Sequence, residues 1–91
     1  MKYELKPEFD SRKSFYRKAK VIKENNKLVL RSYNTRVAEI DLKENKAIIF
    51  KISSQTTLRH IKEFLKQNSF KAETKKQILK DYKKGVGKNE I

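Results

Sequence analysis

The sequence predicts a single α+β domain, in which an antiparallel sheet of three to four strands is followed by two helices packed on one face. Short stretches of alternating apolar and polar residues, separated by asparagine-containing turns, fill residues 15–52. After residue 53 the apolar residues recur every three or four positions, which is the period of a helix. A chain of 91 residues suits one small domain with a modest core.

The N-terminal residues show little periodicity. Residues 1–14 are polar and contain the only proline, Pro7, so we expect an N-terminal arm or a short helical turn. Residues 15–22 predict an imperfect strand near an edge of the sheet. Lys18 and Lys20 should point from this strand to solvent, where lysines protect an edge against association.

Three further strands are expected, joined by turns. Asparagine within residues 24–27 tolerates the positive φ of a two-residue hairpin loop, and a strand follows at 27–32. The next strand covers 36–42, and a second turn at 43–46 leads to the apolar run at 47–52. Because this run is apolar at both alternating positions, it predicts a central or covered strand.

The first helix is expected within residues 53–68, where several hydroxyl side chains offer candidate N-caps. Its apolar stripe consists of Leu58, Ile61, Phe64 and Leu65. The opposite face, expected to meet solvent, carries Arg59, Lys62, Glu63 and Lys66. The helix is too short to stand alone in water, so its stripe must pack against the sheet.

The second helix is expected at about residues 72–84, with Ile78, Leu79 and Tyr82 buried and lysines on the opposite side. Glycines should end it, which leaves residues 85–91 as a flexible C-terminal tail. The folded domain is therefore expected to span residues 15–84.

The charge of the chain is lopsided, with 24 Lys and Arg against 11 Asp and Glu, a formal net charge of +13. Such a charge favours phosphate polymers, anionic membranes or an acidic protein surface as partners. No apolar run approaches the ~20 residues that span a bilayer, and the N-terminus lacks a signal-peptide core. We therefore expect a cytoplasmic protein with no membrane partner.

Few residues suit catalysis, so the sequence predicts a protein that is not an enzyme and takes no cofactor or metal. The chain has one histidine and no cysteine, and no glycine loop that could hold a phosphate. Asp41-Leu42-Lys43 matches the acidic-x-Lys element of some metal-dependent nucleases, with Asp10 as a second candidate ligand. A solvated carboxylate beside a hairpin is the ordinary alternative for Asp41.

Cations and aromatic residues alternate between residues 12 and 20, without an acidic residue. The candidate contacts in this segment are Arg12, Lys13, Tyr16, Arg17, Lys18 and Lys20. This composition suits single-stranded nucleic acid or RNA, because cations bind phosphates and rings stack on bases. The alternative is an edge strand that lysines keep solvated.

His60 has two interpretations. As a structural residue its ring would cover the edge of the apolar stripe and donate one hydrogen bond. As a functional residue it would join Thr57 and Arg59 at the beginning of the helix, where backbone N–H groups attract anions. Tyr16 and Tyr33 are similarly either base-stacking side chains or packed strand residues.

The second helix offers a further possibility, because Lys76, Lys80 and Lys83 would face a groove if the two helices formed a helix-turn-helix. Lysines alone are poorly suited to reading base edges, which argues against this arrangement.

Two segments resemble a domain of small phage and mobile-element proteins. Residues 32–40 follow the pattern SYxTxVAxI, and residues 54–70 follow SxTTxRHIxEFLxQxGF, with Ser69 where glycine is usual. The resemblance covers about residues 28–84 and implies a biological setting rather than a reaction. The matching positions, which become site candidates, are Tyr33, Thr35, Thr57, Arg59 and His60.

The sequence thus predicts a small, non-enzymatic, phage-type accessory protein that binds nucleic acid, or a host nucleoprotein, through a basic surface. If phage-encoded, it would act in the host cytoplasm. The alternative is a protein-binding inhibitor of a host factor such as a defence nuclease, acting by occlusion as anti-CRISPR proteins do.

Overall fold

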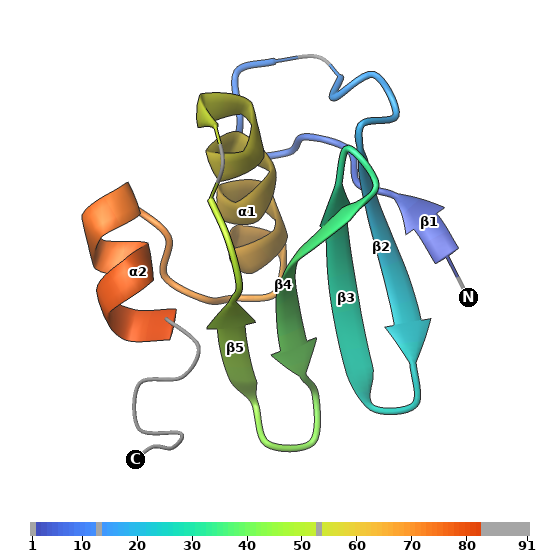
Figure 1. Ribbon diagram of the computed structural model, residues 1–91, viewed down its shortest axis with the longest axis vertical. Coiled ribbons are helices and arrows are strands. Elements are labelled where there is room, and N and C mark those ends of the chain that lie inside the picture. The colour runs from blue at the N-terminus through green and yellow to red at the C-terminus, as the bar shows by residue number, and fades with distance from the viewer. Residues whose placement is uncertain (1, 13, 53, 83–91) are drawn as a thin grey trace.

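The computed structural model describes residues 2–12, 14–52 and 54–82 and confirms the α+β class (Figure 1). In chain order the elements are β1 (Lys2–Glu4), β2 (Ala19–Glu24), β3 (Lys27–Ser32), β4 (Thr35–Asp41), β5 (Lys46–Ile49), α1 (Gln55–Gln67) and α2 (Lys75–Tyr82). The strands form one antiparallel sheet in the order β1-β2-β3-β4-β5. The sheet therefore has five strands, whereas three to four were predicted.

The additional strand comes from the N-terminal segment, which is not the expected arm or helical turn. β1 pairs with β2, with Tyr3 opposite Val21, and the N–H of Leu5 donates to the carbonyl of Ala19 at 2.9 Å. The side chain of Leu5 is buried in the core. A strand of three residues is too short to show an alternating pattern, which explains why the sequence did not reveal it.

The apolar run was expected to be a central or covered strand; β5 is an edge strand, so the first alternative is excluded, and its core side is covered. α2 lies against β5 (Figure 1). Ile78 of α2 and Ile49 of β5 belong to the same hydrophobic core. The apolar run thus indicated a covered strand, but it did not indicate that a helix would cover it or that Ile48 would lie on the open face.

The two faces of the sheet differ. One face packs against α1 and holds the core residues Leu28, Leu30, Ala38 and Ile40, with Ile61, Phe64 and Leu65 of α1 above them. The opposite face, which we call the open face, presents Lys20, Ile22, Val29, Arg31, Glu39 and Ile48, the residues that alternate with the core positions. In Figure 1, α1 lies behind the sheet and the open face is turned to the viewer.

α1 begins at the N-cap Ser54, whose hydroxyl accepts the N–H of Thr57 at 3.1 Å. At its C-terminal end Ser69 adopts a φ of 66°, and the N–H of Phe70 returns to the carbonyl of Leu65 at 2.8 Å. The serine thus takes the left-handed position that glycine usually fills at a helix end. The chain can then turn so that Phe70 packs against the core.

The predicted solvent face of α1 is only partly exposed. The carboxylate of Glu63 is buried and accepts the backbone N–H groups of Glu8, Phe9 and Asp10 at 2.8 to 3.2 Å. Arg59 forms an ion pair with Asp10 at 3.0 Å. The N-terminal segment therefore covers this side of the helix, which could not be expected while residues 1–14 were interpreted as an arm.

α2 begins at Lys75, three residues later than predicted, because the hydroxyl of Thr74 caps it by accepting the N–H of Gln77 at 3.1 Å. Ile78 is buried, and Leu79 and Tyr82 pack against the core. The predicted tail at 85–91 lies outside the described residues, as do positions 83 and 84. No helix in the described part of the chain is long and apolar enough to cross a membrane.

Candidate functional site

Two tight turns lie side by side at one end of the sheet, and each displays a tyrosine. Tyr16 and Arg17 have φ values of 52° and 63°, and Tyr33 and Asn34 have φ values of 53° and 66°. The N–H of Tyr33 donates to the carbonyl of Lys18 at 2.8 Å, which ties the two turns together. Tyr16 is 71% exposed and Tyr33 is 51% exposed, so both rings meet solvent.

This backbone conformation disfavours the residues that occupy it. The left-handed region costs a residue other than glycine or asparagine roughly 1–2 kcal/mol. Glycine would fit three of the four positions better, namely Tyr16, Arg17 and Tyr33. Strained positions of this kind cluster at functional sites, where the side chain is needed.

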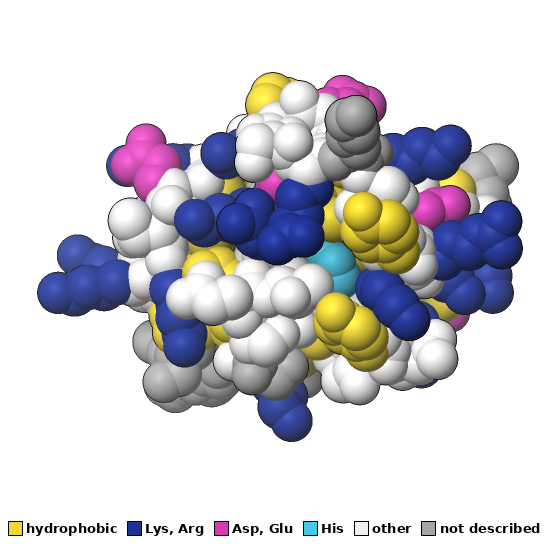
Figure 2. Space-filling view, turned by 90° about the horizontal axis from the view of Figure 1, so that it is seen from above, with side chains coloured by type: hydrophobic (Ala, Val, Ile, Leu, Met, Phe, Trp, Pro, Cys, Tyr) yellow, Lys and Arg dark blue, Asp and Glu magenta, His cyan; other side chains and the backbone are white. Residues whose placement is uncertain are grey.

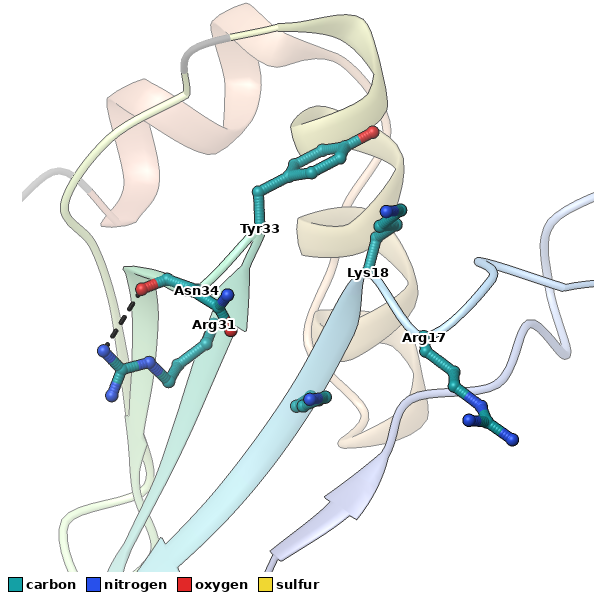
Figure 3. A pocket seen from close by; sticks show the side chains of 6 residues that line it. Arg17, Lys18, Arg31, Tyr33 and Asn34 are labelled. Atoms are coloured by element: carbon teal, nitrogen blue, oxygen red, sulfur yellow. Dashed lines mark hydrogen bonds between the residues drawn. The ribbon is translucent and has the colours of Figure 1, made fainter.

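A hollow of about 210 Å³ lies between these turns and the open face, lined by Arg17, Lys18, Lys20, Arg31, Tyr33 and Asn34 (Figure 3). We call it the Tyr33 hollow. Its lining contains four cations and no carboxylate. Among the described residues, none of the four cations is part of an ion pair.

The orientation of the lining side chains is defined by a few contacts. Arg31 donates from Nη2 to the carbonyl of Asn34 at 3.1 Å, and Lys18 Nζ lies 5.9 Å from the centroid of the Tyr33 ring. In Figure 3 the Tyr33 ring and Lys18 point the same way, whereas Arg17 points away from them. Lys20 and Arg31 stand directly opposite each other on β2 and β3. Like charges in this position destabilise a sheet unless an anion lies between them.

His60 lies beneath Tyr33 and has a structural role here. Its side chain is 1% exposed, and Nδ1 lies 2.8 Å from the hydroxyl of Ser32. Its ring meets those of Phe15 at 4.6 Å and Tyr33 at 5.9 Å. Burial lowers the pKa of His60 to about 4, although the charge of Asp10 opposes this shift. The imidazole is therefore neutral at pH 7 and supports the turn that displays Tyr33.

Figure 2 shows this end of the molecule. The histidine side chain lies near the centre of the view, surrounded by basic and hydrophobic side chains. The Ser32–His60 pair is not arranged as a nucleophile and base. Both residues are buried where β3 meets α1, and a substrate has no access there.

The other predicted site residues are dispersed. Thr57 is buried within the Ser32 and Ser54 hydroxyl cluster, and Arg59 is held by Asp10. Arg12 and Thr35 are exposed and are not among the residues that line the hollow. Lys76 and Lys80 line a separate surface groove on α2. Lys13 and Lys83 lie outside the described residues.

The site includes two residues that sequence reasoning missed, Arg31 and Asn34. The sequence did contain a signal for Arg31. If Asn25 and Asn26 form the two-residue hairpin turn, the strand pairing places Arg31 directly opposite Lys20, which was already a site candidate. Asn34 contributes through the turn geometry that its side chain tolerates.

The acidic residues considered as metal ligands have local structural roles. Asp41 accepts the N–H groups of Lys43 and Glu44 at 3.0 and 2.9 Å, and Asp10 binds Arg59. The described residues contain no group of three His, Cys, Asp or Glu side chains that could hold a metal ion.

Residues 3–80 match the Family of unknown function (DUF8033), and the chain belongs to this family. The match begins in β1 and ends in α2, so the family extends over the N-terminal strand as well as the sheet and helices. No curated protein and no solved structure matches the chain.

Proposed function

We propose that this member of the DUF8033 family is a non-enzymatic protein that binds single-stranded nucleic acid at the Tyr33 hollow. One observation carries the proposal: four cations, none of them in an ion pair among the described residues, line one hollow together with a half-exposed tyrosine. The phage or mobile-element setting suggested by the sequence motif is compatible with such an accessory role.

The cations suit phosphate groups. Lys20 and Arg31 repel each other across β2 and β3, and a bound phosphate would convert that repulsion into two attractions. Arg17 and Lys18 extend the positive surface beyond the edge of the strands. Because phosphate contacts supply most of the affinity in nucleic-acid binding, this group of cations is the primary binding element.

The tyrosine ring suits a base and favours a single strand over a duplex. The ring of Tyr33 contacts the ring of His60, and its backbone is fixed in the tight turn. About half of the side chain is left exposed to solvent. Stacking of a base on an aromatic side chain contributes about 1–3 kcal/mol. In a duplex the bases are already stacked on one another and are not accessible to the ring.

Fluorescence anisotropy with a labelled single-stranded oligonucleotide tests the proposal. For four phosphate contacts the logarithm of the association constant should fall with the logarithm of salt concentration at a slope of about −3. Affinity should therefore drop about 50-fold between about 50 and 200 mM salt. Binding that does not respond to salt, or that is equally tight for duplex, would overturn the proposal.

A charge reversal tests the hollow itself. Arg31→Glu should abolish binding and leave the fold intact, because the new carboxylate would lie between Lys20 and Arg36 on neighbouring strands. Lys23→Glu changes the net charge equally on an exposed position of β2 outside the hollow, and it should bind nearly as the wild type does. A folded Arg31→Glu protein with wild-type affinity would remove the hollow from consideration.

A further inference from the structure

The open face carries a row of like charges that runs across three strands. Lys20 on β2 stands opposite Arg31 on β3, and Arg31 stands opposite Arg36 on β4. Near the other end of the same strands, the corresponding row alternates in sign. Its members are Glu24, Lys27, Asp41 and Lys46. The alternating row is what an ordinary solvated sheet face requires, and the cationic row is not.

A β-bulge brings Arg36 into the cationic row. The register of β3 and β4 shifts between Leu30 and Arg31, so that Ala38 pairs with Leu30 whereas Arg36 pairs with Arg31. Without the shift, Arg36 would share the core-facing parity of Ala38. With it, Val37 is buried in the core and Arg36 is exposed on the open face, where it binds Glu39. Bulges commonly redirect a side chain in this way beside functional sites.

An aromatic side chain continues the row beyond β4. The Arg36 guanidinium lies 5.2 Å from the centroid of the Phe50 ring, and the N–H of Phe50 donates to the carbonyl of Val37 at 2.8 Å. Phe50 is partly exposed and follows β5 directly in the sequence. Phe50 thus lies beyond the β4 end of the cationic row, whereas Tyr33 lies in the turn between β3 and β4, next to the Arg31–Arg36 pair.

We propose that the nucleic-acid strand crosses the open face from the Tyr33 hollow to Phe50, perpendicular to the β-strands, with Arg36 and Phe50 as a second contact point. This inference rests on the proposed function. Three strand spacings of ~4.8 Å separate β2 from β5, so the path covers about 14 Å. Phosphates lie over the cationic row, and bases stack on the rings of Tyr33 and Phe50.

The ion pair of Arg36 with Glu39 is compatible with this role. Glu39 is 4% exposed and is shared between Arg36 and Lys27, which holds the guanidinium in one place over the Phe50 ring. A guanidinium has five N–H donors, and the carboxylate uses only part of them. Arg36 is thus pre-positioned, with donors left for a phosphate.

Ligand length separates this inference from the proposed function. A dinucleotide has one internucleotide phosphate and occupies the Tyr33 hollow alone, whereas a strand of about ten nucleotides covers the whole path. Phe50→Ala should weaken the longer ligand about tenfold, as expected for one lost stacking contact, and leave the dinucleotide unchanged. Arg36→Gln should behave likewise. NMR chemical-shift titration serves for the dinucleotide and anisotropy for the longer strand.

Two control variants make the outcomes distinct. Phe9→Ala removes a ring that is 58% exposed on the N-terminal segment and should change neither affinity. Phe50→Leu keeps apolar bulk in case the alanine variant unfolds, and it should still lose stacking. Equal affinities of wild type and Phe50→Leu for the longer strand, or equal losses for both ligand lengths, would overturn the inference. Absence of binding by the wild type at every length would instead overturn the proposed function.

Discussion

Three residues beside the Tyr33 hollow occupy backbone conformations that their side chains do not favour. Tyr16, Arg17 and Tyr33 all have positive φ. Glycine in these turns would ease the backbone, but it would contribute no ring and no charge to the surface. The protein thus accepts a small loss of stability to display two tyrosines and an arginine, which is the pattern expected of a functional surface.

Arg17→Gly should therefore separate stability from binding. The free energy of unfolding should stay unchanged or rise by up to about 1 kcal/mol, because glycine adopts the left-handed conformation without strain. Affinity for a single strand should fall roughly tenfold, since one charged contact is lost. Denaturant titration and anisotropy measure the two quantities.

Asn25→Gly is the matched control, because Asn25 also has positive φ but lies in the hairpin at the opposite end of β2. It should leave affinity unchanged. If Arg17→Gly binds as tightly as the wild type, Arg17 does not contact the ligand.

Protonation of His60 makes the free energy of unfolding depend on pH between about 6.5 and 4. Its pKa is lowered from 6.5 to about 4 in the folded protein, so the unfolded chain takes up a proton that the folded protein does not. This contribution is fully present above about pH 6.5 and is lost as the pH falls towards 4, on the order of 3 kcal/mol in total. No other histidine shares the window. Denaturant titrations at about pH 7.5, 5.5 and 4.5 should show the decline.

His60→Asn removes the titration, and its side-chain amide can still bond to Ser32. The slope between about pH 6.5 and 4.5 should then disappear. An unchanged slope in His60→Asn would show that the imidazole is not the group responsible.

Asp10 contributes to the pH dependence of stability at lower pH than His60 does. Burial alone would raise its pKa, but the N–H of Arg12 and the charge of Arg59 outweigh this and lower it. Its contribution is lost only as the pH falls below about 3.8.

At the scale of the element, α1 has two buried sides. Leu58, Ile61 and Leu65 face the sheet, whereas Arg59, Glu63 and Gln67 recur every four residues and hold the N-terminal segment. Glu63 and Gln67 bond to the backbone of this segment, Gln67 by donating to the carbonyl of Lys6 at 2.7 Å, and Arg59 pairs with the side chain of Asp10. A polar helix face is thus no guarantee of exposure.

Glu63→Gln should release the N-terminal segment. The amide nitrogen would meet backbone N–H groups that now donate to a carboxylate, which leaves donors facing donors at a cost of about 2–4 kcal/mol. Hydrogen exchange at Glu8, Phe9 and Asp10 should accelerate strongly, while the amides of β3 stay protected. Lys62→Gln, on the same helix but outside these bonds, should change neither. Protection that survives at all three amides would mean that Glu63 does not hold the segment.

The periodicity of the sequence predicted most helices and strands, but it did not predict which elements lie next to one another in the fold. The strand at 27–32 was placed at its observed bounds, and α1 was found within two residues, because both have long, regular patterns. β1 and the edge position of β5 were missed, since short strands and sheet order leave little local trace. The bulge at Val37 was also invisible, so Arg36 was not recognised as a cation of the open face.

The candidate site was predicted in part for the same reason. Tyr33, Arg17, Lys18 and Lys20 were chosen by composition and motif, and the structure brings them into one hollow. His60 and Thr57 were chosen by motif as well, but they are buried beneath it. Sequence patterns mark residues that the fold needs without distinguishing those that support a surface from those that form it.

At the scale of the whole molecule, the net charge of +13 on 91 residues works against the compact state and for polyanion binding. Salt screens both interactions. Raising salt should therefore stabilise the free protein, because repulsion such as that between Lys20 and Arg31 weakens. The same change should destabilise the complex, because phosphate contacts weaken.

Thermal melts with and without oligonucleotide should consequently converge as salt rises. At about 100 times the dissociation constant the ligand stabilises the folded protein by about 2.7 kcal/mol, a rise in Tm of roughly 10–20 °C for a domain of this size. If affinity falls about 50-fold by 200 mM salt, the same ligand concentration contributes less than about 1 kcal/mol. The Tm of the free protein rises over that range. In Arg31→Glu both salt responses should shrink, since the variant removes the central cation of the row, whereas Lys23→Glu should retain most of the ligand response. Two melting curves that shift in parallel with salt would show that the ligand does not bind through the cationic row.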